Sequence, residues 1–312
     1  MIYFEQAGRL GNQLFRYAAA RAAQLRRGGN EDIVMGVGSY RKYGGKNGFV
    51  DSLRDLCIGD VKRIEEPIAE HYPCGIKLAY RALFQIPKIR RLSPDSFENR
   101  YWHIFNKLGI LLGTYGSYKF DIYHKRNLFL DGNFQDPAFF NDIREVLLRE
   151  FCPKYPEVKD NTELYHVIRE TESVCISIRR GDFLSTSFKG DFFVCGKDYF
   201  LEAMNRIKDY VKNPTFIFFS DDIEWVKDNI KVDGSCYYES GKDPVWEKLR
   251  LMYSCKHFIL SNSSFSWWVQ YLSRNPDKVV IAPDHWYNNK DIEKRSNLLQ
   301  PNFIKIPCPR YD

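Results

Sequence analysis

The chain contains the stretch Ser173-Val174-Cys175-Ile176-Ser177-Ile178-Arg179-Arg180-Gly181-Asp182, in which an apolar run of strand length ends at two adjacent arginines. Ligands of open parallel sheets bind beyond the carboxyl ends of the strands, and a guanidinium there offers a fork of donors to phosphate oxygens. The stretch therefore predicts a buried strand that delivers Arg179 and Arg180 to an anion-binding loop. Pairing of these arginines with Asp182 on the surface would also explain the pattern.

Apolar runs alternate with helical patterns through the second half of the chain. In order they are strand 174–178, helix 197–210, strand 215–219, helix 222–229, helix 244–254, strand 257–260, helix 264–273 and strand 278–281. Such alternation indicates a parallel sheet with crossover helices. The second half is therefore predicted to be an α/β domain.

The amino-terminal half opens in a similar way. A predicted strand at Ile2-Tyr3-Phe4 leads through a glycine loop, Gly8 to Gly11, into an alanine-rich helix that stops at Gly28-Gly29. The N–H groups of a helix start attract anions, and glycines let a ligand approach the backbone. A plain glycine turn that opens the first βα unit is the alternative.

Residues 128–136 read as a strand that enters a polar loop, after which Pro137 is predicted to open a helix through Phe151. The segment 152–162 contains two prolines and several charges, so it is the predicted linker.

Two further strands end in polar residues. After strand 215–219, Asp222 is placed to cap the next helix, and Asp221 could accept a hydrogen bond from the base or ribose of a nucleotide. After strand 257–260, the hydroxyl-rich segment 261–266 precedes a helix and predicts a phosphate-binding nest. Trp267 and Trp268 are predicted to lie in the core, and contact of one of them with a sugar is the alternative.

Composition limits the function classes. The net charge of +6 is modest and diffuse, which argues against a nucleic-acid partner. No signal peptide precedes the first strand, and no apolar run of about 18 residues occurs that could span a membrane. The eight cysteines lack zinc-site spacing and are expected to be free thiols. We expect a cytoplasmic protein, with peripheral contact to the inner face of a membrane left open.

Four stretches resemble fucosyltransferase signatures. Ser177-Ile178-Arg179-Arg180-Gly181-Asp182 is similar to the His-x-Arg-Arg-x-Asp motif of α1,2-, α1,6- and protein O-fucosyltransferases. The others resemble signatures of the α1,2-fucosyltransferases of glycosyltransferase family 11: Gly8-Arg9-Leu10-Gly11-Asn12-Gln13-Leu14-Phe15, Phe219-Ser220-Asp221-Asp222 and Asn262-Ser263-Ser264-Phe265-Ser266-Trp267-Trp268. They follow the family's order and cover nearly the whole chain.

The resemblance implies two Rossmann-like α/β domains that face each other across a cleft, the arrangement called GT-B. Residues 1–155 would form the acceptor side, and residues 156–312 would bind GDP-fucose. The implied reaction is inverting transfer of L-fucose from GDP-fucose to a hydroxyl, O2 of galactose, with formation of an α1,2 linkage. The acceptor would be a galactose-containing oligosaccharide or a lipid-linked glycan.

The resemblance also implies a set of site residues. Arg179 would be catalytic, because it would stabilise the charge that develops on the departing diphosphate. The implied GDP-fucose-binding residues are Gly11, Asn12, Ser177, Arg180, Asp182, Asp221, Ser263, Ser264 and Phe265. Asp182 would hold one of the arginines in orientation. No metal or cofactor is expected, since arginine, hydroxyls and a helix terminus would already offset the diphosphate charge.

Two points stay open. The family usually has His where this chain has Ser177, and we expect this position to be structural. The motifs identify no general base, and Glu5, Asp131 and Asp136 are candidates only. The alternatives are an α1,6- or protein O-fucosyltransferase and a non-catalytic module that binds nucleotides or polyanions.

Overall fold

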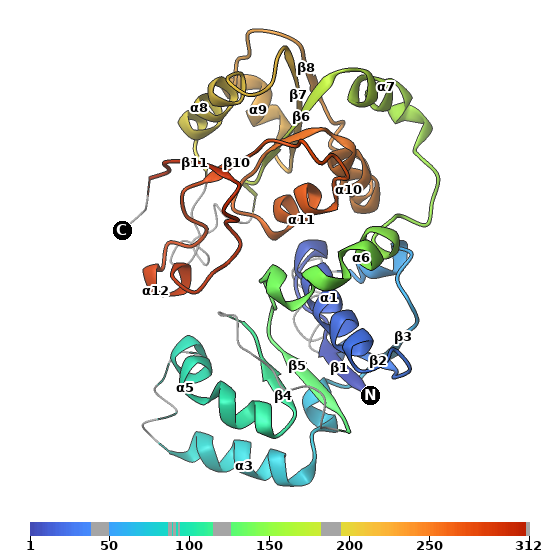
Figure 1. Cartoon of the computed structure of the whole chain (residues 1–312), viewed down its shortest axis with the longest axis vertical. Coiled ribbons are helices and arrows are strands. Elements are labelled where there is room, and N and C mark those ends of the chain that lie inside the picture. Colours follow the sequence, from blue (N-terminus) through green and yellow to red (C-terminus); the bar gives the residue numbers. More distant parts are fainter. Residues whose placement is uncertain are drawn as a thin grey trace. The chain divides into compact units, whose positions relative to one another are not determined.

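The computed structural model describes residues 1–38, 50–86, 89, 92, 94–114, 126–181 and 195–309. The chain divides into two compact units (Figure 1). The first contains Met1–Arg54, Ile58–Glu150 and Arg295–Asn297, and the second contains Asp55–Cys57, Phe151–Lys294 and Leu298–Asp312. Each unit therefore includes a short segment from the other half of the sequence.

The first unit is built on a parallel sheet. In sheet order its strands are β3 (Val61–Ile64), β2 (Ile33–Gly36), β1 (Ile2–Glu5), β5 (Leu128–Asp131) and β4 (Ile110–Leu112). The chain builds from β1 outward to β3 and then continues on the opposite edge, so the strand order reverses between β1 and β5. In open parallel sheets such a reversal is the switch point at which ligands bind.

Helices cover both faces of this first sheet. Tyr3 lies in register with Val34 and Phe129, and these three side chains share an apolar cluster with α3 (Cys74–Gln85) and α5 (Pro94–Lys107). Strand side chains alternate between faces, so Ile2 and Phe4 point to the other side of the sheet. There α1 (Leu10–Arg26) packs against β1 and β2 (Figure 1).

Helix α1 ends where the sequence predicts, just before Gly28 and Gly29. The helix is rich in alanine, the best helix former, and most of its side chains are buried. It ends at Arg26, where Gly28 and Gly29 adopt φ values of 95° and 80°. The amide of Gly29 donates to the carbonyl of Gln24 at 2.9 Å, which completes a Schellman-like end.

The predicted helix from Pro137 to Phe151 is wrong in its first part. The structure has two 3₁₀ turns, η3 (Pro137–Phe139) and η4 (Asn141–Ile143), before the short helix α6 (Arg144–Glu150). Phe140 lies between the turns with φ −146° and breaks the helical path. Its ring is fully buried, so core packing of Phe140 overrides the helical pattern.

Short 3₁₀ turns also follow two strands of the first unit. They are η1 (Ser52–Asp55) and η2 (Ile68–His71).

The second unit contains a parallel sheet with the strand order of a Rossmann fold. Its strands, in sheet order, are β11 (Ile304–Ile306), β10 (Val280–Pro283), β9 (His257–Ile259), β6 (Glu172–Ile178), β7 (Pro214–Ser220) and β8 (Cys236–Tyr238). Counted along the chain from β6, this is the order 3-2-1-4-5-6 read from the β8 edge. The switch point therefore lies between β6 and β9. The prediction of two Rossmann-like α/β domains is confirmed at the level of these two sheets.

Both faces of the second sheet are covered. On β6, Val174, Ile176 and Ile178 share an apolar cluster with α8 (Lys197–Ile207) and α9 (Ile223–Asn229). The alternate residues Ser173 and Ser177 contact the opposite layer, which contains the remaining long helices of the unit. These are α7 (Thr162–Glu170), α10 (Val245–Ser254) and α11 (Ser264–Leu272), and the short helix α12 (Lys290–Glu293) follows later in the chain.

All predicted strands and helices of this half occur within a few residues of their expected bounds. Trp267 and Trp268 are fully buried, as predicted.

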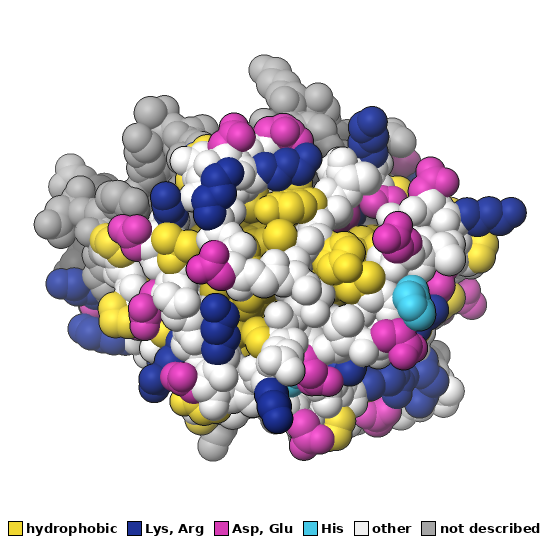
Figure 2. Space-filling model, turned by 90° about the horizontal axis from the view of Figure 1, so that it is seen from above, with side chains coloured by type: hydrophobic (Ala, Val, Ile, Leu, Met, Phe, Trp, Pro, Cys, Tyr) yellow, Lys and Arg dark blue, Asp and Glu magenta, His cyan; other side chains and the backbone are white. Residues whose placement is uncertain are grey.

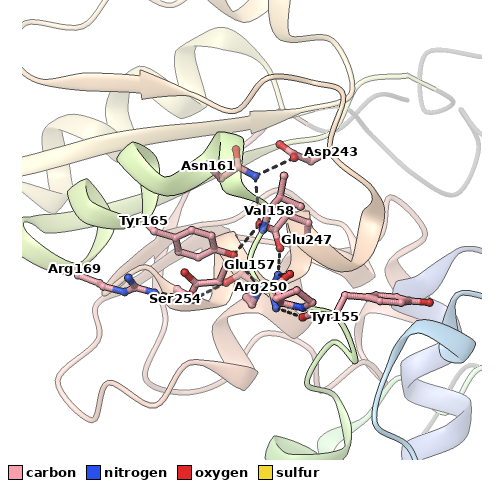
Figure 3. Close-up of polar contacts among 11 residues, drawn as sticks. Tyr155, Glu157, Val158, Asn161, Tyr165, Arg169, Asp243, Glu247, Arg250 and Ser254 are labelled. Carbon is pink, nitrogen blue, oxygen red and sulfur yellow. Dashed lines mark hydrogen bonds and ion pairs between the residues drawn. The ribbon is translucent and has the colours of Figure 1, made fainter.

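The segment predicted as a linker is fixed to the second unit by a buried ion pair (Figure 3). Glu247 of α10 has no exposed side-chain surface, pairs with Arg250, and accepts hydrogen bonds from the amide of Val158 and the hydroxyl of Tyr165, each at 3.0 Å. Arg250 in turn donates to the carbonyl of Tyr155 at 2.6 Å. Within the second unit, η5 (Lys159–Asn161) joins this packed segment to α7.

Among the described residues, no helix is long and apolar enough to cross a membrane. On the face shown in Figure 2, Lys and Arg side chains are interspersed with Asp and Glu. Among the described residues on this face, the two charge signs are therefore mixed, unlike the broad areas of one sign that bind polyanions.

Candidate active site

The arginine loop of the second unit begins where β6 ends. Arg179 Nη1 lies 2.7 Å from Asp221 Oδ2, and the backbone amide of Arg180 donates to Asp221 Oδ1 at 3.0 Å. A Cβ atom on Gly181 would lie 2.6 Å from Asp221 Oδ2, so only glycine fits without moving that carboxylate. Asp221 thus holds both the first guanidinium and the backbone of the loop.

Arg180 is held separately from Arg179. Its guanidinium lies 3.5 Å from the ring centroid of Trp225 on α9, and its Nε lies 3.4 Å from Asp222 Oδ2. Asp222 also accepts a hydrogen bond from the Trp225 amide at 3.3 Å, so the predicted helix cap is confirmed. Within the described residues, Asp221 pairs with Arg179 and Asp222 pairs with Arg180, while Asp182 lies outside them.

Three of the six residues in the hydroxyl-rich segment 261–266, which follows β9, are buried. Ser261, Asn262 and Ser266 have at most 1% of their surface exposed. The hydroxyls of Ser261 and Ser266 lie 3.1 Å apart, and the amide of Asn262 donates to the Trp286 carbonyl at 3.2 Å. These three side chains hold the loop in place and are not available as a row of phosphate donors.

The accessible part of this segment is the first turn of α11. Ser263 is the N-cap and accepts a hydrogen bond from the Phe265 amide at 3.3 Å. Ser263, Ser264 and Phe265 are each partly exposed. A helix amino terminus carries unpaired N–H groups and the positive end of the helix dipole, so this turn can accept an anion.

Ser177 is a buried residue that connects the end of β6 with the hydroxyl-rich segment after β9. Its side chain is only 6% exposed, and its hydroxyl lies 2.6 Å from that of Ser266. Its carbonyl accepts a hydrogen bond from the Ser261 amide at 3.2 Å. Ser177 therefore ties the end of β6 to the loop after β9, directly at the switch point. Its predicted contact with the donor stays a prediction.

The glycine loop of the first unit prepares the start of α1. Gly8 has φ +72°, and a Cβ atom there would lie 2.6 Å from the side-chain amide nitrogen of Asn12. Asn12 is partly exposed, and its side-chain carbonyl accepts a hydrogen bond from the Gln135 amide at 2.9 Å. Gly11 is buried within α1. Gln13 is buried and donates to the Gly8 carbonyl at 2.9 Å, which closes the loop.

A second polar group lies one turn further along α1. Arg16 donates to the Glu5 carbonyl and to the side chain of Asn133, both at 2.8 Å. Asp131 ends β5 and accepts a long hydrogen bond of 3.4 Å from the Tyr72 hydroxyl. These residues belong to the first unit and surround the switch point between β1 and β5.

Burial shifts the ionisation of this group. Desolvation lowers the pKa of Arg16 to about 10, although Asp131 and Glu5 oppose the shift. Desolvation also raises the pKa of the Asp131 carboxyl, with Arg16 and the Tyr72 hydrogen bond opposing. A carboxylate with a raised pKa is a stronger proton acceptor than an exposed one.

Arg16 and Asn133 were missed in the sequence, although a signal exists for Arg16. Asn12 and Arg16 are four residues apart and thus share one face of α1. This face carries polar side chains on an otherwise buried helix. Asn133 and Gln135 lie two residues apart in the loop after β5. Both form hydrogen bonds with side chains of α1.

Comparison with known proteins gives consistent results. The profile of the family described as Glycosyl transferase family 11 matches residues 1–306. An alpha-1,2-colitosyltransferase of Escherichia coli is 29% identical over 306 residues, which are 92% of this chain and 92% of that protein. A galactoside alpha-(1,2)-fucosyltransferase 1 of Leontopithecus chrysomelas is 27% identical over 158 residues, which are 46% of this chain and 42% of that protein. Among solved structures, the fucosyltransferase NodZ from Bradyrhizobium has a TM-score of 0.48 and 12% identity, covering 87% of this chain and 91% of that chain.

Proposed function

Because this chain belongs to glycosyl transferase family 11, we propose that it transfers L-fucose from GDP-fucose to a hydroxyl of an acceptor glycan and forms an α1,2 linkage. The observation that carries the proposal is Arg179, which Asp221 holds beyond the carboxyl end of β6, the strand that borders the switch point of a Rossmann-ordered sheet. The names of the two relatives support the linkage, since both enzymes are called alpha-1,2-transferases.

The second unit is the proposed donor site. A Rossmann-ordered sheet binds nucleotides beyond the carboxyl ends of the strands at its switch point, here between β6 and β9. Arg179 would bridge two diphosphate oxygens, and the accessible turn at Ser263, Ser264 and Phe265 would contribute N–H groups. Asp221 would act on the donor through Arg179.

The chemical step follows from this placement. The bond between the anomeric carbon of fucose and the β-phosphate oxygen breaks, and its electron pair leaves with GDP. Positioned donors stabilise the negative charge that develops on the diphosphate, which lowers the barrier. The acceptor oxygen attacks from the opposite face, so the anomeric configuration inverts.

The first unit is the proposed acceptor side. Asn12, which is expected to contact the donor sugar, accepts a 2.9 Å hydrogen bond from Gln135 that fixes both amide groups, and such groups suit the hydroxyls of a sugar. Galactose O2 is the proposed position of transfer, and a galactose-containing oligosaccharide or lipid-linked glycan is the proposed acceptor.

A second donor sugar is favoured by one observation. The colitosyltransferase is matched over 92% of its length, whereas the fucosyltransferase of Leontopithecus chrysomelas is matched over 42%. Colitose is L-fucose without the hydroxyl at C3, so the same diphosphate site would serve either sugar. A pocket that bonds the C3 hydroxyl would discriminate strongly against the sugar that lacks it.

The test is a donor and acceptor screen. Purified protein is incubated with GDP-fucose or GDP-colitose and a β-galactoside, and the product linkage is determined by NMR spectroscopy. An α1,2-linked fucoside is the expected product. A colitoside formed in preference to the fucoside would show that GDP-colitose is the donor in place of GDP-fucose. An α1,6 linkage would contradict the proposed regiochemistry. Absence of transfer with both donors across a galactoside panel would contradict the proposed activity.

A further inference from the structure

The switch point of the first sheet carries a polar group that donor binding leaves unexplained. Glu5 ends β1 and Asp131 ends β5, and these two strands are neighbours in the sheet. Arg16 of α1 and Asn133 lie beside them. Ligands of parallel sheets bind at this kind of position, so the group is a candidate for contact with the acceptor.

The carboxylates of Glu5 and Asp131 differ in the hydrogen bonds that they accept. Glu5 Oε2 accepts a hydrogen bond from the Ile68 amide at 2.8 Å, so Glu5 fixes the start of η2. Asp131 Oδ2 has only the 3.4 Å contact with the Tyr72 hydroxyl, and Oδ1 has no hydrogen-bond partner within the described part of the chain. Asp131 is partly exposed as a residue although its carboxyl is desolvated, so Oδ1 is the carboxylate oxygen that remains for a ligand.

Arg16 acts on the charge of Asp131 without forming an ion pair with it in the described part of the chain. Its two terminal nitrogens donate to the Glu5 carbonyl and to Asn133, and no ion pair joins Arg16 to Asp131 among the described residues. Its charge nevertheless acts on the carboxyl, as the pKa of each side chain shows. Arg16 therefore favours the ionised form of Asp131, against the desolvation that raises the pKa of this carboxyl, without occupying its oxygens in a direct ion pair.

The backbone around Asp131 is rigid. Gly132 has φ +153°, and a Cβ atom there would lie 2.5 Å from the carbonyl carbon of Gly113. Phe134 is buried with φ +53°, a left-handed conformation that is uncommon for a bulky residue. Strain of this kind persists where the surrounding packing fixes the chain, and it clusters at functional sites. Asp131 is thus presented from a fixed position.

We propose that Asp131 is the general base that takes the proton from the acceptor hydroxyl, with Arg16 as a positioning residue. The inference rests on the proposed function, since it assigns the proton acceptor for the same transfer. Arg16, held by the Glu5 carbonyl and by Asn133, sets the electrostatic surroundings of the carboxylate.

The acceptor oxygen forms a bond to the anomeric carbon of the donor sugar while the bond from that carbon to the β-phosphate oxygen breaks. The proton of the acceptor hydroxyl moves to Asp131 Oδ1, and the electron pair of the broken bond leaves with GDP. Asp131 then returns its proton to water, so the net products are glycoside, GDP and one proton.

Burial of Asp131 supports this role. Desolvation raises the pKa of the carboxyl, and the groups that act on it are Arg16 of α1 and Tyr72 after η2. A buried carboxylate destabilises the folded state above its unfolded pKa, because its charge is better solvated in the unfolded chain. Replacing Asp131 by Asn should therefore leave stability unchanged or increase it.

The test compares Asp131→Asn with a matched control, Asp142→Asn. Asp142 lies in the same unit, but it forms a surface ion pair with Arg26. Turnover, binding of GDP-fucose by calorimetry and the melting temperature are measured for both variants, with the donor that the wild-type chain uses. We expect Asp131→Asn to lose at least about a hundredfold in turnover, with donor affinity within about threefold and an undiminished melting temperature. Asp142→Asn should match the wild type in turnover.

Other outcomes decide against the proposal in distinguishable ways. Turnover of Asp131→Asn within tenfold of an active wild type would overturn the base assignment and leave the proposed function intact. Lost turnover together with a lowered melting temperature would make Asp131 structural. Asp131→Glu, which restores a carboxylate at a shifted position, should recover part of the lost turnover, and equal loss in Glu and Asn variants would contradict a proton-accepting role. Inactivity of the wild type with both donors would overturn the proposed function itself.

Discussion

Arg179 at the end of β6 and Asp221 just after β7 are joined by a 2.7 Å contact between Nη1 and Oδ2. The strands are neighbours, with Ile178 opposite Ser220, so the two residues leave the sheet side by side. Asp221 also accepts from the Arg180 amide, so one carboxylate fixes both the guanidinium and its loop. A cation held in this way needs little reorganisation when charge develops on a ligand.

Arg179→Lys is expected to lose most turnover while GDP affinity changes by a modest factor. Lysine keeps the charge but lacks the fork that spans two phosphate oxygens. Loss of such a contact in the transition state raises the barrier by about 2–4 kcal/mol. Initial rates and calorimetric GDP binding measure the two effects. The control is Arg206→Lys, a surface arginine paired with Asp209 in the same unit; near wild-type turnover of Arg179→Lys would remove Arg179 from its assigned role.

Gly181→Ala tests whether the position of Asp221 matters. The added methyl group would lie 2.6 Å from Asp221 Oδ2, so the carboxylate and the paired Arg179 must move. We expect turnover to fall at least about tenfold and stability to fall by about 1–3 kcal/mol, the range for overpacking. Rates and denaturant unfolding report the two quantities.

The matched control for this substitution is Gly75→Ala. Gly75 lies in α3, where an added Cβ meets no heavy atom within 4 Å. Alanine is a better helix former than glycine by about 1 kcal/mol, so this variant should be as stable as the wild type or more stable. Equal behaviour of the two variants in turnover would show that the Asp221 contact is unimportant for transfer.

The second sheet could be predicted well because its central strands are buried on both faces. Continuous apolar runs such as Val174 to Ile178 leave a clear mark in the sequence. Two strands at the edges were not predicted. β8 has only three residues, all half-buried, and β11 likewise has three with an exposed lysine at its centre, so neither forms a distinctive apolar run.

The site was only partly predictable because its contacts depend on which strands are neighbours. The motif containing Arg179 indicates an anion-binding arginine, but the pairing with Asp221 requires β6 and β7 to be adjacent. The grouping of Arg16 with Asp131 requires β5 to insert beside β1, which no local pattern encodes. The hydroxyls of Ser261 and Ser266 resemble ligand donors in the sequence, yet core packing uses both internally.

Transfer is expected to continue in the presence of EDTA. In the proposed donor site, Arg179 and the amino terminus of α11 would supply positive potential to the diphosphate. Across the described ranges, no group of three or more His, Cys, Asp and Glu side chains could hold a metal ion. Initial rates are compared with EDTA, with added magnesium and with added manganese. Loss of transfer in EDTA that magnesium or manganese restores would show that a cation takes part in the site.

Ser177→Ala is expected to lower turnover by roughly tenfold or less, in line with about 0.5–1.5 kcal/mol for one neutral hydrogen bond. The hydroxyl of Ser177 is buried and lies 2.6 Å from that of Ser266, which keeps a second partner in Ser261 at 3.1 Å. Removing Ser177 Oγ therefore leaves Ser266 satisfied and moves the β6 end only slightly. A proton-accepting role is not expected, because a serine alkoxide does not form near neutral pH without an adjacent base. Turnover and GDP affinity of Ser177→Ala are measured beside Ser254→Ala, a control whose exposed hydroxyl donates to the Arg250 carbonyl at 2.7 Å on α10. A thousandfold collapse of turnover in Ser177→Ala with GDP affinity intact would instead assign this hydroxyl a chemical role in the transfer.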